Sequence, residues 1–236
     1  SLVAPARKVI PAVVSDFDVE GIFNDDSAGV GKLNVLVEHK AFAWSSPGDA
    51  KYIIVEYNIV NNGSGTLDGL YAGIFADWDI MDPFLNRASF DAFNKMGYVY
   101  STQSGSPYAG IKLLTGGTVT HHAIDADGSN GIINVYDGYS TAEKFQSLSS
   151  NRSNAGVQPG GNDVMDVIGT GPFNLLQGDT VIIAFALIAG DDLSQLRASA
   201  QAAQVKYDEY TSPETGINEF QSQSLKFKVL PNPSRG

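Results

Sequence analysis

Alternating apolar and polar residues mark several short strands along this chain. The alternation is clearest over residues 33–39 and 52–60, and the second run ends in the turn signal Asn61-Asn62-Gly63-Ser64-Gly65. Clusters of Gly, Asn, Ser and Asp separate these runs at intervals typical of antiparallel sheets. The pattern therefore predicts an all-β fold, a large and mostly antiparallel β-sandwich with one or two helices. Further strands are predicted over 70–76, 97–100, 109–114, 132–136 and 180–189.

Two segments carry helical signals instead. Ser140-Thr141-Ala142-Glu143 matches a capping box and predicts a short helix that ends near Leu148. Asp191-Asp192-Leu193 predicts the start of a longer helix, through about Tyr210, in which apolar residues recur at three- and four-residue spacing. We expect this helix to pack on a face or an edge of a sheet, so that the sandwich spans residues 1–210.

Composition excludes several classes of protein. The 236 residues carry a formal net charge of −11, with 19 Asp against 7 Glu, and Asp favours turns, helix caps and metal-binding loops. An acidic chain with no basic stripe argues against nucleic-acid binding. The absence of cysteine excludes disulfides and zinc–thiolate sites. The longest apolar run, residues 181–189, is too short to span a bilayer, so no transmembrane segment is predicted.

The last residues, Lys228-Val229-Leu230-Pro231-Asn232-Pro233-Ser234-Arg235-Gly236, follow a short strand-like run that begins at Leu225. They resemble the opening of the C-terminal sorting domain found on cargo of the type IX secretion system in Bacteroidetes. The resemblance implies that 225–236 is the start of a sorting domain that continues past Gly236. The preceding residues 211–224 are rich in Ser, Gln, Glu and Thr, and this composition predicts a polar linker. The resemblance also implies a secreted or outer-membrane surface location, with the secretion machinery and an upstream domain of the same polypeptide as partners.

A second resemblance is carried by six segments of the body of the chain, namely 24–29, 54–61, 71–80, 97–100, 108–111 and 184–191. In these segments the chain is similar to a β-rich accessory region of large exported Bacteroidetes proteins, which often lies downstream of subtilisin-like or metalloprotease domains. This resemblance implies a non-catalytic, structural role.

Acidic residues gather directly after the predicted strand 70–76. Strand alternation puts Asp77 and Asp79 on one side, and the loop that follows can fold back to supply Asp82, Asn86 and Asp91. Hard oxygen ligands that converge from one loop suit Ca²⁺, which takes roughly six to eight of them. The five residues therefore predict a Ca²⁺ site, and the alternative is a solvated acidic turn.

A weaker metal candidate comprises Asp125, Asp127 and Asn130, within the sequence Asp-Ala-Asp-Gly-Ser-Asn-Gly. The start of this loop is similar to an EF-hand, but Tyr136 stands where the bidentate Glu of that loop belongs. An ordinary Asp- and Gly-rich turn is therefore the favoured interpretation.

Two functions from other classes stay open. Trp44 and Trp78 could act as stacking platforms in a carbohydrate-binding or adhesion module, which requires them on an exposed surface. A hydrolase would require two facing carboxylates, such as Glu38 and Glu56, or a Ser–His pair in a deep cleft. His121 and His122 are neighbours on a predicted strand and point to opposite faces, so they cannot bind one metal ion together.

Overall fold

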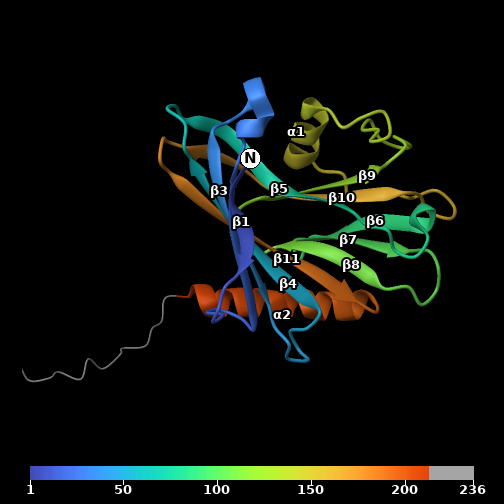
Figure 1. Cartoon of the computed structure of the whole chain (residues 1–236). Helices are drawn as coiled ribbons and strands as arrows, with labels where there is room; N and C mark the ends of the chain where they lie inside the picture. Colours follow the sequence, from blue (N-terminus) through green and yellow to red (C-terminus); the bar gives the residue numbers. More distant parts are fainter. Residues whose placement is uncertain (213–236) are drawn as a thin grey trace, which may run out of the picture.

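The computed structural model describes residues 1–212, which form two β-sheets and two α-helices (Figure 1). The larger sheet has eight strands in the order β1-β2-β3-β4-β11-β8-β7-β6, and the smaller sheet has three in the order β5-β10-β9. All neighbouring strands within each sheet run antiparallel. The mostly antiparallel β-sandwich predicted from the sequence is thereby confirmed.

The strands of the larger sheet are β1 (Leu2–Lys8), β2 (Phe17–Asn24), β3 (Val35–Ala43), β4 (Tyr52–Asn61), β6 (Asn86–Asp91), β7 (Met96–Ser101), β8 (Tyr108–Leu113) and β11 (Thr180–Gly190). Those of the smaller sheet are β5 (Leu67–Asp77), β9 (Val119–Asp125) and β10 (Val164–Leu175). The helices are α1 (Thr141–Ser149) and α2 (Leu193–Thr211), and two short 3-10 turns, Asp26–Gly31 and Pro83–Leu85, complete the elements.

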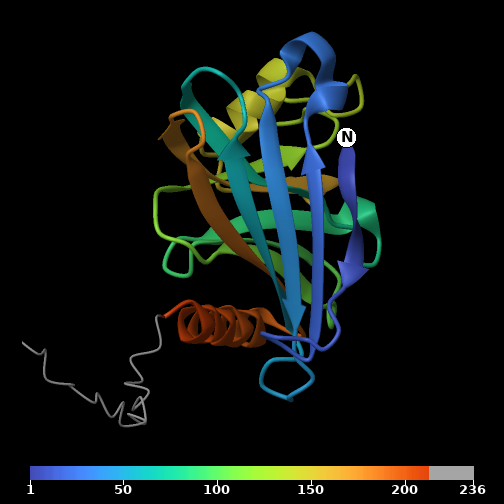
Figure 2. The same ribbon diagram turned by 60° about the vertical axis from the view of Figure 1, so that its left-hand side comes forward.

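The molecule is built in four layers, in the order α2, larger sheet, smaller sheet, α1 (Figures 1 and 2). Between the sheets, Val55, Ile168 and Phe185 form the centre of one core cluster. On the opposite face of the larger sheet, α2 buries Leu196 and Ala200 in a second cluster. Alternate side chains of the larger sheet therefore serve two different cores.

Both predicted helices are present, and their starts have the predicted caps. The Ser140 side chain accepts from the backbone N–H of Glu143, whose carboxylate in turn accepts from the Ser140 N–H, which completes the capping box of α1. The Asp192 side chain accepts from the backbone N–H of Gln195 at 2.8 Å at the start of α2.

The prediction of a strand over 132–136 is wrong. This segment is a loop, and its only fully buried side chain, Ile133, inserts into an apolar cluster with Ile124 and Met165 beneath α1. The backbone N–H groups of Val135 and Tyr136 both donate to the carbonyl of Ala126, at 2.8 and 3.3 Å, and hold the loop back on itself. The apolar run thus anchors a loop, and apolar content alone does not distinguish that role from a strand.

The segment 151–162 connects the two sheets at one side of the sandwich. Arg152 pairs with the edge of β9, where its N–H donates to the carbonyl of His121 and its carbonyl accepts from Ala123. A few residues later, Ala155 and Asn162 form backbone pairs with β6, the edge strand of the larger sheet. One loop therefore covers two strand edges. The predicted linker over 211–224 and the predicted sorting segment 225–236 lie almost wholly outside the described residues.

Candidate metal centre

Three carboxylates converge at one end of the smaller sheet, on the side that carries α1. Asp77, Asp79 and Asp163 each place a carboxylate oxygen within 4.8 Å of the others. The arrangement follows from strand alternation, because Ala76 and Trp78 point into the core between the sheets and leave Asp77 and Asp79 on the opposite side.

Asp163 comes from a distant part of the sequence and joins the cluster through strand register. β10 pairs with β5 with Met165 opposite Asp77. When this antiparallel register continues by two residues, Asp163 lies opposite Asp79. The Tyr136 hydroxyl, from the loop between β9 and α1, donates to Asp163 at 2.5 Å. The cluster therefore brings together three separate segments of chain.

The electrostatics of the cluster are those of uncompensated negative charge. Partial burial, followed by the charges of Asp163 and Asp79, raises the pKa of the Asp77 carboxyl. The hydrogen bond to Asp163, more than burial, raises the pKa of Tyr136 to about 12. Within residues 1–212, no Lys, Arg or His forms an ion pair with any of the three carboxylates. A divalent cation would relieve this repulsion and gain oxygen ligands.

The other three residues predicted for the site lie elsewhere, because the chain crosses from the smaller sheet to the larger one after Asp79. Asp82 accepts from the Phe84 N–H and caps the short turn that follows it. Asn86 is fully buried and donates to the backbone carbonyls of Asp82 and Pro83. Asp91 lies at the end of β6, where Arg197 Nε donates to it at 2.7 Å.

Asp125, Asp127 and Asn130 form a structured turn rather than a set of oxygens facing one point. Asp125 is fully buried and accepts from Arg152, from Gly156 N–H and from Asn162. Asp127 accepts from Ser129 and from the same Asn162 side chain. The Asn130 amide donates to Gln158 at 3.4 Å. Hydrogen bonds from the chain itself therefore occupy both carboxylates.

The two tryptophans lie on opposite faces of the larger sheet. Trp44 packs against the α2 core, with its ring centroid 5.9 Å from that of Tyr52 and with Lys206 above it. Trp78 is half-buried between the sheets, and its indole nitrogen is buried without a hydrogen-bond partner within the described chain. They do not share one surface, so they do not form a common stacking platform.

The histidines occupy opposite faces of β9, as alternation predicts. His121 is fully buried between the sheets, with Nε2 2.6 Å from a carboxylate oxygen of the equally buried Asp166 and its ring stacked on Phe90. His122 faces α1 and contacts the Ser150 hydroxyl. His121 and Asp166, a histidine–carboxylate pair of the kind used in acid–base catalysis, are thus inside the core.

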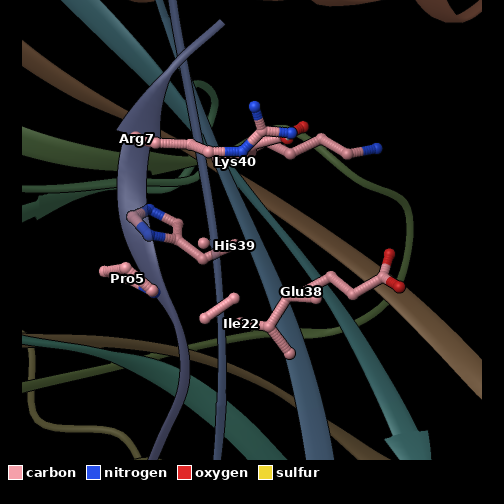
Figure 3. Close-up of a pocket in the computed structure, with 9 residues that line it drawn as sticks. Pro5, Arg7, Ile22, Glu38, His39 and Lys40 are labelled. Carbon is pink, nitrogen blue, oxygen red and sulfur yellow. The ribbon is translucent and has the colours of Figure 1, made fainter.

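Glu38 and Glu56 lie on the same face of the larger sheet, on neighbouring strands. Figure 3 shows the small pocket between β1, β2 and β3, where Glu38 and Lys40 extend to one side of β3 and the His39 ring lies toward β1. Glu56 contacts Lys40 at 3.6 Å and lies farther in, beneath the end of α2. The two carboxylates therefore have different surroundings.

Comparison with known proteins adds little to this description. No family model matches the chain, and no curated protein matches it. Among solved structures, it is similar to a crystal structure from Escherichia coli K12 named a "putative aldose 1-epimerase", with 9% sequence identity and a TM-score of 0.41 over 78% of this chain and 68% of that one. At that level, the similarity supports no statement about what this chain binds. No helix within residues 1–212 has the length and apolarity needed to cross a membrane.

Proposed function

We propose that this chain is a non-catalytic accessory β-sandwich module of a secreted or surface-bound bacterial protein, stabilised by Ca²⁺ at Asp77, Asp79 and Asp163. The observation that carries the proposal is the convergence of three carboxylates at the adjoining ends of β5 and β10, none of which forms an ion pair with a Lys, Arg or His of the described chain. The resemblance of the chain to accessory regions of exported Bacteroidetes proteins supports the location and the non-catalytic role.

The proposed ion has a structural role, because its ligands lie on elements that are distant in sequence. Asp77 ends β5 and Asp163 immediately precedes β10, so an ion bound by both holds these strand ends together. The main-chain carbonyls near these strand ends and water would complete the oxygen shell that Ca²⁺ requires. Since the site exists only when β5 and β10 are paired, binding favours the folded state.

Thermal unfolding tests the proposal directly. We expect Ca²⁺ at about 100 times its Kd to raise the Tm by roughly 5–10 °C over an EDTA-treated sample, since binding at that excess is worth about 2.7 kcal/mol. Mg²⁺ should give a smaller shift, because it demands tighter octahedral geometry. The increase should be lost in Asp77→Asn and in Asp163→Asn.

The matched control is Asp68→Asn, which removes an exposed carboxylate from the same strand, β5, at its other end. This variant should keep the full Ca²⁺ effect. If Ca²⁺ leaves the Tm of both the wild type and Asp68→Asn unchanged, the cluster is a solvated acidic turn and the proposal fails. The proposal also fails if Ca²⁺ raises the Tm of Asp163→Asn as much as that of the wild type.

A further inference from the structure

A cavity of about 400 Å³ lies on the face of the larger sheet that carries α2, and it is separate from the acidic cluster. Its walls come from three places, namely the connection between β1 and β2, the outward-facing side chains of β2 to β4, and the C-terminal end of α2. Its apolar lining includes Val13, Val14 and Phe42, and its polar lining includes Lys40, Glu56 and Tyr210.

Glu56 is a largely buried residue, 8% exposed, that lines this cavity. Within residues 1–212 its carboxylate accepts no hydrogen bond, and its oxygens are not among the atoms that are sealed from solvent. Among the described residues its one charged contact is the Lys40 ammonium at 3.6 Å, which exceeds hydrogen-bond distance. Tyr210 lines the same cavity, although its hydroxyl oxygen is sealed from solvent and has no partner in the described chain. A largely buried carboxylate is costly unless it is paired, so Glu56 marks a place where a ligand can supply the partner.

The cavity has an excess of negative charge. Asp18, Glu20 and Glu56 line it against one ammonium, that of Lys40. Asp18 already accepts from the backbone N–H groups of Val13 and Val14, which closes the β1–β2 connection over the sheet. Glu20 is paired with Arg7. This leaves Glu56 as the carboxylate with capacity for a further donor.

We infer that this cavity binds a primary ammonium group carried on a short alkyl chain. The ammonium donates to Glu56, and the alkyl chain lies against Val13, Val14 and Phe42. Such a group combines a charged donor with an apolar stem, as a lysine side chain does, and so matches both parts of this lining. Both a free alkylamine and a lysine side chain of a partner protein have this chemistry.

Isothermal titration of the full chain tests the inference with two probes, n-pentylammonium and Nα-acetyl-lysine N-methylamide, and with 1-pentanol and pentanoate as uncharged and anionic comparisons. We expect saturable binding of pentylammonium and at least tenfold weaker binding of the other two pentyl compounds. Binding of the lysine derivative as well identifies a lysine side chain as a ligand, whereas its failure identifies a free amine. If pentylammonium does not bind saturably, the inference is wrong.

Three substitutions locate the site. Glu56→Gln keeps the shape of the side chain and should weaken pentylammonium binding at least tenfold. Glu38→Gln, on the same face of the neighbouring strand but outside this cavity, should leave binding unchanged. Lys40→Met removes the internal competitor for Glu56, so it should tighten binding severalfold and enlarge the ligand-induced increase in Tm. Equal binding by wild type and Glu56→Gln, or weaker binding by Lys40→Met, would overturn the assignment.

Discussion

Asp163 shows how a residue can belong to a site that the local sequence does not indicate. It follows a Gly- and Pro-rich loop, and nothing around it resembles a metal-binding motif. Asp77 and Asp79 were predictable because their spacing and the preceding strand place them on one side. Asp163 joins them only through the β5–β10 register, which depends on packing of the whole sheet. Asp82 and Asn86 are close to Asp79 in sequence, and this proximity predicts that they share its site. The prediction fails because the chain changes sheets between Asp79 and β6, which the sequence does not reveal.

Asp77 leads to a prediction about how the stability of the folded protein depends on pH. Its pKa in the folded protein is raised above the unfolded value of about 3.9, so the folded state binds more protons in the pH range just above that value. Without metal, this group therefore destabilises the fold as pH rises through its folded pKa. In EDTA, Asp77→Asn should have a higher Tm than the wild type at pH 7, and the difference should vanish near pH 3.

With excess Ca²⁺ at pH 7, the order of the two proteins should reverse, because only the wild type retains the full set of ligands. A variant that melts below the wild type in EDTA at pH 7 would show that the carboxylate is not repelled by its neighbours, contrary to this argument.

At the scale of elements, the sequence predicts those helices and strands whose caps or alternation lie within the element itself. The caps at Ser140 and Asp192 predicted the starts of both helices, and regular alternation predicted β3 and β4. β10 was missed because it is buried on both faces for most of its length and carries Asp166 inside the core, so it shows neither alternation nor a simple apolar run. One carboxylate oxygen of Asp166 is paired with His121 of β9, a partner that only the folded sheet supplies, and the other oxygen is buried without a partner in the described chain.

The cap of α2 gives a testable difference between two adjacent aspartates. Asp192→Ala removes the acceptor for the Gln195 N–H and should lower the free energy of unfolding by about 1 kcal/mol. Asp191→Ala removes a fully exposed ion pair with Lys51, which solvent screens, and should cost clearly less than Asp192→Ala. Urea denaturation of both variants beside the wild type measures the two values, and equal losses would contradict the assigned cap.

At the scale of the whole molecule, the segment 151–162 makes the two sheets one unit. Arg152 donates to the fully buried Asp125 carboxylate while its backbone pairs with β9, and the same segment then pairs with β6. Such a connection is not predictable from the sequence, where 151–162 has the composition of an ordinary loop. Its importance follows from what it covers, namely two strand edges that would otherwise be open.

Arg152→Met should be strongly destabilising, because it leaves Asp125 buried without its cation. We expect a loss of about 3–5 kcal/mol in the free energy of unfolding, against less than about 1 kcal/mol for Lys32→Met, which breaks an exposed pair with Asp26. Far-UV circular dichroism and tryptophan fluorescence should report one coincident urea transition in each variant. Separate transitions would show that the sheets unfold independently.

The position of β11 has a consequence for how the chain is made. β11 lies between β4 and β8 in the larger sheet, although β4 ends at Asn61 and β11 begins only at Thr180. Until ribosomal synthesis has passed this strand, β1–β4 and β6–β8 have no common neighbour, and the facing edges of β4 and β8 remain unpaired. Open edges pair readily with other chains, and folding that waits for such distant contacts is slow. During synthesis the two halves of the larger sheet therefore keep open edges until the strand at its centre is inserted, and this is the period in which we expect the chain to be most prone to aggregation.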